Sequence, residues 1–65
     1  MNRNQYLNIL EKNLRSLKKE ETDDILQDFT EYFEVGLERG RAEQELIASL
    51  GNPGTLARQI RFESY

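Results

Sequence analysis

A run of twenty residues from Glu20 to Arg39 limits the fold of this chain more than any other feature, because apolar side chains recur in it every three or four positions. On a helix this spacing places on one face Ile25, Leu26, Phe29, Tyr32, Phe33, Gly36 and Leu37. The remaining surface then carries Glu20, Asp23, Asp24, Asp28, Glu31, Glu34 and Glu38. We therefore predict one long amphipathic helix whose apolar face is covered by other parts of the chain.

A shorter, leucine-rich helix is predicted before it, over about residues 3–17, with Asn2 or Asn4 as its N-cap. Side chains spaced three or four residues apart lie on the same face of a helix, and this spacing is shared by Leu7, Leu10, Leu14 and Leu17. A connection of only a few residues makes consecutive helices antiparallel neighbours. We expect these leucines to cover Phe29 and Phe33 of the long helix.

Glycine and proline divide the C-terminal third into two short helices. Gly40 suits the position just after the long helix, and Gly51 suits the same position after an apolar segment over about residues 42–50. The Asn52-Pro53 pair combines a preferred N-cap with a preferred first helical residue, so a fourth helix is expected over about residues 53–61.

These segments predict an all-α, compact four-helix domain that comprises residues 1–65: a long antiparallel helical hairpin followed by two short C-terminal helices. Gly36 lies inside the apolar face of the long helix, where glycine is less favourable than alanine. We interpret Gly36 as the point at which another helix crosses closely.

The composition argues against catalysis. The chain has no cysteine and no histidine, which removes thiolate chemistry, Cys/His zinc sites and the usual imidazole base. Carboxylates such as Asp24, Asp28 and Glu31 recur along one helix, but they lack the glycine-bent loop of a calcium site, and the serines and threonines lack a base that would activate them. We expect a protein that is not an enzyme and has no cofactor, catalytic site or metal site.

Charge is strongly segregated along the chain. Residues 1–19 carry five basic side chains and one acidic side chain, whereas residues 20–38 carry eight acidic side chains and no basic one. We expect Lys18 and Lys19 at the C-terminal end of the first helix, where they offset the helix dipole. The acidic face of the long helix is the predicted partner-binding surface, and we assign to it Asp28, Glu31, Glu34, Val35 and Glu38.

Two other functions fit parts of the sequence. Residues 46–61 have the spacing of a helix-turn-helix, with Ile47, Gly51, Ala57 and Ile60 as packing positions. Outward residues for a DNA groove would then be Thr55, Arg58, Gln59 and Arg61. The neighbouring acidic helix opposes DNA phosphates, so we do not expect direct nucleic-acid binding. A small structural domain that forms a homodimer through Ile9 and Val35 is the other alternative.

The pattern as a whole resembles the bacterial HAAS signalling domain, the small helical N-terminal domain of membrane proteins often encoded beside PadR-type transcriptional regulators. The resemblance rests on Met1-Asn2, Tyr6-Leu7, Leu10, Leu17, Ile25-Leu26, Asp28-Phe29, Tyr32-Phe33-Glu34, Gly36-Leu37, Gly40, Glu43, Glu45-Leu46-Ile47, Leu50-Gly51-Asn52-Pro53, Leu56-Ala57 and Ile60. Family members usually have proline after the last leucine of the first helix and serine or threonine before the third, where this chain has Lys18 and Ala42.

The resemblance implies a regulatory protein-interaction domain that acts with a PadR-like transcriptional regulator. No run of the sequence approaches the roughly 18 apolar residues of a membrane-spanning helix. We expect a cytoplasmic location, at the cytoplasmic face of the membrane if the domain is part of a longer protein.

Overall fold

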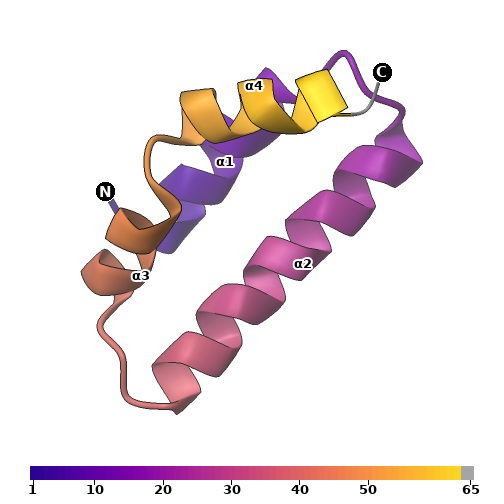
Figure 1. Ribbon diagram of the computed structural model, residues 1–65. Helices are drawn as coiled ribbons and strands as arrows, with labels where there is room; N and C mark the ends of the chain where they lie inside the picture. Colours follow the sequence, from indigo (N-terminus) through magenta and orange to yellow (C-terminus); the bar gives the residue numbers. More distant parts are fainter. Residues whose placement is uncertain (64–65) are drawn as a thin grey trace.

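The computed structural model describes residues 1–63, which form four helices joined by short connections (Figure 1). The helices are α1 (Arg3–Asn13), α2 (Lys19–Glu38), α3 (Glu43–Leu50) and α4 (Pro53–Glu63). No strand occurs within residues 1–63, so the predicted all-α fold with four helices is confirmed. The last helix extends two residues beyond its predicted end at Arg61.

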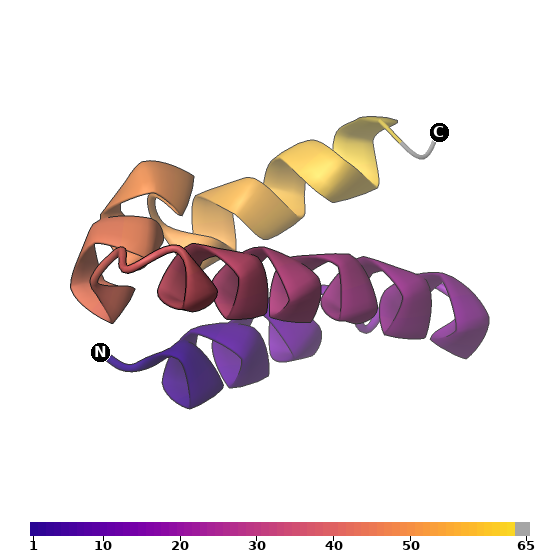
Figure 2. The same ribbon diagram turned by 90° about the horizontal axis from the view of Figure 1, so that it is seen from below.

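Three helices lie alongside one another, and α3 packs at the end of this group that also holds the N-terminus (Figures 1 and 2). α1 and α2 run antiparallel, as the predicted hairpin requires, and α1 contacts each of the other three helices. The Asn2 side chain caps α1 by accepting a hydrogen bond from the backbone N–H of Gln5 at 2.8 Å. Next to this cap, the backbone N–H of Arg3 donates to Glu43 Oε1 at 2.8 Å, which fastens the start of α1 to α3.

The first helix is shorter than predicted, because α1 ends at Asn13 and not at Leu17. The Asn13 side chain donates to the Ile9 carbonyl at 2.8 Å, and the backbone N–H of Leu14 bonds to the Glu11 carbonyl, three residues back. Asparagine side chains compete in this way with the helical backbone, and the three-residue spacing tightens the last turn. Leu14 is still fully buried, so the predicted leucine face is continued by a turn and not by a helix.

Two lysines therefore lie elsewhere than predicted. Lys18 is the N-cap of α2 and Lys19 is its first residue, so both stand at the positive end of a helix dipole and not at the negative end of α1. Lys18 makes no side-chain capping bond. The connection is held instead by the Leu14 carbonyl, which accepts from the backbone N–H of Leu17 at 3.0 Å and from the buried Thr22 hydroxyl at 3.3 Å.

The core has two clusters of fully buried side chains that α1 joins. The first contains Tyr6, Phe33 and Leu46, which come from α1, α2 and α3. The second contains Leu10, Leu14 and Ala57, with Phe29 half-buried against it. Leucines and a tyrosine from the N-terminal segment thus cover the aromatic side chains of α2, as predicted, and α4 completes the cover over Leu10 and Leu14.

The end of α2 is fixed by a hydrogen-bonded glycine turn. Gly40 has φ of +87°, and its N–H donates to the Leu37 carbonyl at 3.0 Å, while the Arg41 N–H donates to the Gly36 carbonyl at 3.0 Å. This pair of bonds is the Schellman motif, which only a residue tolerant of positive φ completes without strain. The predicted stop at Gly40 is confirmed, and the turn directs the chain into α3.

The close helix crossing predicted at Gly36 is also confirmed. A Cβ atom built on Gly36 would lie 2.5 Å from Leu46 Cδ2, so α3 packs directly against the α2 backbone at this point. One member of the predicted apolar face does not join the core, because Leu37 is 38% exposed. Since α3 covers α2 on the side of Phe33 and Gly36, Leu37 lies at the uncovered margin.

The junction of α3 and α4 follows the predicted caps, but its packing differs from a helix-turn-helix. Gly51 has φ of +81°, and Asn52 Oδ1 accepts hydrogen bonds from the backbone N–H groups of Gly54 at 2.8 Å and Thr55 at 3.2 Å. Ile47 packs with the first core cluster, whereas Ala57 and Ile60 pack with the second, because α4 lies mainly on α1. The predicted packing positions of that motif are therefore divided between two clusters.

Candidate functional site

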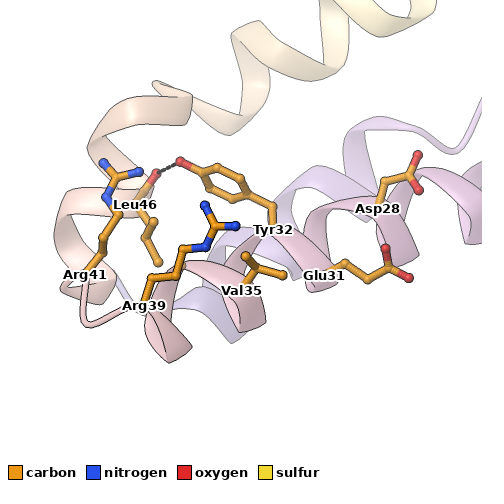
Figure 3. A pocket seen from close by; sticks show the side chains of 8 residues that line it. Asp28, Glu31, Tyr32, Val35, Arg39, Arg41 and Leu46 are labelled. Atoms are coloured by element: carbon orange, nitrogen blue, oxygen red, sulfur yellow. Dashed lines mark hydrogen bonds between the residues drawn. The ribbon is translucent and has the colours of Figure 1, made fainter.

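An open groove of about 390 Å³ lies between the C-terminal half of α2 and α3, and we call it the α2–α3 groove (Figure 3). Its lining residues are Asp28, Glu31, Tyr32, Val35, Gly36, Arg39, Arg41 and Leu46. Seven of these eight residues come from α2 and the turn that follows it, and Leu46 is supplied by α3. The groove therefore depends on the fold of the turn between the two helices.

The middle of the groove is apolar. Val35 is 44% exposed, and beside it lie the ring of Tyr32 and the bare backbone of Gly36, against which Leu46 is packed. The Tyr32 hydroxyl donates to the Leu46 carbonyl at 3.3 Å, which links the two walls and leaves one face of the ring toward the groove (Figure 3). A partner side chain placed here would cover Val35 without displacing any core residue.

The two ends of the groove carry opposite charge. Asp28 and Glu31 lie at one end and Arg41 lies at the other, while the Arg39 side chain extends from the Arg41 end toward Val35 and Tyr32 (Figure 3). Glu31 and Arg39 are separated by eight residues on α2, which corresponds to roughly 12 Å along a helix. The groove thus presents both signs of charge, and within residues 1–63 no ion pair joins Glu31 and Arg39.

Within residues 1–63, Arg41 is the only one of these four charged side chains that forms a hydrogen bond or an ion pair. Arg41 Nε lies 3.0 Å from Glu45 Oε1, and Arg41 Nη2 donates to the Ser49 hydroxyl at 3.3 Å. Within residues 1–63, Asp28, Glu31 and Arg39 have no hydrogen-bond or ion-pair partner for their side chains. These three charges are available to another molecule.

The residues assigned to a partner surface from the sequence are all exposed, but the structure divides them. Asp28, Glu31 and Val35 line the α2–α3 groove, whereas Glu34 and Glu38 do not. The helical spacing of Glu34 and Glu38 puts them on the flank of α2 beside Glu31, just outside the groove lining. The assignment therefore covers two adjacent surfaces of one helix.

Sequence reasoning missed the other residues of the groove. Tyr32 and Gly36 were expected in the core, and they do contact it, but each also borders the groove from the edge of the apolar face. Arg39 and Arg41 were visible in the sequence as the first cations after the acidic run. The position of Leu46 in the groove could not be predicted from the sequence, because its contact with Gly36 depends on the turn that packs α3 against α2.

Charge pairing within the chain is sparse. The Arg41–Glu45 pair is the single salt bridge among residues 1–63, so the basic residues of α1 do not pair with the acidic residues of α2. The eight carboxylates of α2 have no ion-pair partner in this part of the chain. The acidic surface of α2 thus remains unneutralised after folding.

No metal-binding geometry accompanies these carboxylates: within residues 1–63, no group of three or more acidic side chains converges closely enough to hold an ion. Tyr6 is a buried titratable group whose pKa is changed by folding. Burial, and secondly the neighbouring Tyr32, raise the pKa of Tyr6 above its ordinary value of 10.0. The Tyr6 hydroxyl has no hydrogen-bond partner within residues 1–63, and it lies in the core and not in the groove.

The residues considered for DNA contact lie on α4. Thr55, Arg58 and Gln59 are exposed, but Arg61 is half-buried and its Nε is enclosed by the protein. Ile9 of the alternative homodimer surface is also half-buried. None of the helices within residues 1–63 combines the length and the apolar character that crossing a bilayer requires.

Comparison with known proteins identifies the family. The HAAS family model matches residues 5–59, a span that includes α2 and α3 entirely and most of α1 and α4. No curated protein and no solved structure matches the chain. Because the matched residues cover most of the sequence, together with all the elements that build the groove, the chain belongs to the HAAS family.

Proposed function

We propose that this chain is a regulatory protein-interaction domain that binds a PadR-like transcriptional regulator through the acidic side of α2. Membership of the HAAS family supports a small signalling or interaction domain. In this proposal the domain is not an enzyme, and it acts in the cytoplasm, where a transcriptional regulator works.

The observation that carries the proposal is the set of unpaired carboxylates on α2. Like charges three or four residues apart destabilise a helix, and this helix places them at Asp24, Asp28, Glu31, Glu34 and Glu38. Within residues 1–63, no basic side chain forms an ion pair with these carboxylates. A basic surface on another protein would relieve the repulsion and would be steered toward α2 by the same charge.

The proposal is tested by reversing the acidic side of α2. We expect the triple variant Glu31→Lys, Glu34→Lys and Glu38→Lys to bind the PadR-like regulator at least about tenfold more weakly, which corresponds to about 1.4 kcal/mol. The affinity is measured by isothermal titration calorimetry, and circular dichroism checks that the helix content is unchanged. Unchanged affinity in a folded triple variant would remove this surface from the proposal.

A matched control distinguishes an effect of where the acidic side chains lie from an effect of the net charge of the domain. The variant Glu11→Lys, Glu63→Lys, Asn8→Lys and Ser16→Lys changes the net charge equally, and all four side chains are exposed outside α2. We expect its affinity to stay within about twofold of the original, because solvent-exposed charges are screened beyond roughly 8 Å at physiological salt. An equal loss in both variants would mean that net charge alone attracts the regulator.

The proposal also predicts that the domain itself does not hold DNA. The exposed residues of α4 lie on a chain with a net charge of −3, and the packing positions expected for a helix-turn-helix are divided between two clusters. In a gel-shift experiment with duplex DNA at physiological salt, the domain alone should give no shifted band. A shift that weakens steeply with added salt would instead support phosphate contacts from α4.

A further inference from the structure

We propose that the α2–α3 groove binds one amphipathic helix of a protein partner, and that this helix carries an apolar side chain between a basic residue facing Asp28 and Glu31 and an acidic residue facing Arg39. This inference rests on the proposed function, since it specifies which part of the interaction surface recognises the partner and by what chemistry. It differs from charge attraction alone, because it requires an apolar anchor and a cationic contact.

The apolar anchor follows from the middle of the groove. Val35 is 44% exposed although its immediate neighbours in the groove are the apolar surfaces of Tyr32 and Leu46. Gly36 also lines the groove and adds no side chain to its surface. Binding energy in such interfaces is concentrated on an anchor that fills a central apolar depression.

The helical form of the partner follows from the backbone around the groove. The walls are formed by α2, α3 and the turn between them, and within residues 1–63 there is no strand edge that could pair with an extended segment. An extended peptide would therefore find no backbone partner in the groove and would leave its own N–H and C=O groups to water. A helix satisfies these groups internally and presents only side chains, which is the recognition mode that the groove permits.

The charges give this helix its pattern. Within residues 1–63, Arg39 is the groove cation without a partner, because Arg41 is already bonded to Glu45 and Ser49. The backbone positions of Glu31 and Arg39 are eight residues apart, a helical rise of roughly 12 Å, which matches about two turns of a bound helix. The partner residues that face them are therefore expected about eight positions apart, with the apolar anchor midway.

The test uses fluorescein-labelled synthetic helices of about 16 residues, which exceed the length of the groove. One pair of peptides carries lysine, a central leucine pair and glutamate on one face, in either order along the chain, because the groove does not fix the helix direction. A third peptide replaces the glutamate with lysine. Fluorescence anisotropy with the intact domain measures their affinities, and we expect one of the mixed-charge peptides to bind with a Kd tighter than about 100 μM.

Charge exchange provides the decisive comparison. Arg39→Glu should weaken the mixed-charge peptide about fivefold and strengthen the all-lysine peptide by a similar factor, since like and opposite charges exchange places. Glu31→Lys should also weaken the mixed-charge peptide about fivefold. The matched control Glu11→Lys makes the same substitution at an exposed position of α1 outside the groove, and it should change the affinity by less than about twofold.

Three results would overturn the inference. These are the absence of binding by either mixed-charge peptide, an equal effect of Arg39→Glu on the mixed-charge and all-lysine peptides, and an effect of Glu11→Lys as large as that of Glu31→Lys. The whole PadR-like regulator is titrated in parallel. If the regulator binds and Arg39→Glu leaves its affinity unchanged, the groove is rejected as the recognition site while the proposed function stands. If the peptides bind as expected but the regulator does not bind, only the proposed function is rejected.

Discussion

Gly36 of α2 lies so close to the Leu46 side chain of α3 that a Cβ atom on Gly36 would be 2.5 Å from Leu46 Cδ2 and 2.8 Å from Cδ1. Both residues are buried, and Leu46 is fully enclosed by the first core cluster. This contact sets the distance between α2 and α3 and, through it, the depth of the α2–α3 groove.

The variant Gly36→Ala should therefore destabilise the domain by about 1 kcal/mol. Alanine improves the helix propensity by up to about 1 kcal/mol, but overpacking a buried site typically costs 1–3 kcal/mol. Urea denaturation measures the change. In a Leu46→Ala background the space beside Gly36 is open, so the same substitution should become stabilising; a destabilising effect of similar size there would show that the clash with Leu46 is not the cause.

The variant Tyr6→Phe should leave the stability unchanged or raise it by about 1 kcal/mol. The Tyr6 hydroxyl is fully buried and has no hydrogen-bond partner within residues 1–63, and an unpaired buried polar group costs about 1–3 kcal/mol. Tyr32→Phe is the matched control, because the Tyr32 hydroxyl donates to the Leu46 carbonyl and its removal should lower the stability by about 1 kcal/mol. A clear loss in Tyr6→Phe would reveal a partner for that hydroxyl.

The same tyrosine should make the domain sensitive to alkaline pH. Burial raises the pKa of Tyr6 above 10.0, so the unfolded chain releases this proton at a lower pH than the folded domain does. The unfolding free energy should consequently fall as the pH rises above about 10, by at most about 1.4 kcal/mol per pH unit from this residue. Comparison of the original chain with Tyr6→Phe between pH 8 and about 11 isolates the effect, because other titrating groups are common to both; parallel curves would contradict it.

The variant Lys18→Ser should stabilise α2 by about 1 kcal/mol. Lys18 has the extended backbone of an N-cap but makes no capping bond, and serine here would stand three residues before Glu21, which is the arrangement of a capping box. Thermal unfolding followed by circular dichroism measures the gain. Lys18→Ala removes the same charge without supplying a cap, so a similar gain in both variants would assign the effect to the helix dipole alone.

The sequence by itself determined the local structure of this protein. The apolar period of α2, the Asn2 and Asn52 caps and the glycines at positions 40 and 51 act within a few residues, and each was found where the pattern predicted it. The acidic character of α2 also follows from the sequence alone, because side chains on the polar face of a helix stay in water. Helix propensity and capping are local properties, so they do not depend on the rest of the fold.

Only the tertiary structure decided how far each apolar face was covered and where charge and apolar surface meet. It left Leu37 at an uncovered margin and placed Leu46 beside Gly36 to complete the α2–α3 groove. It also separated Glu34 and Glu38 from the three assigned residues that line this groove. These outcomes depend on contacts between helices that are distant in sequence. The apolar period of a helix can be read from the sequence, but the close packing of its side chains is fixed only when the helices are assembled.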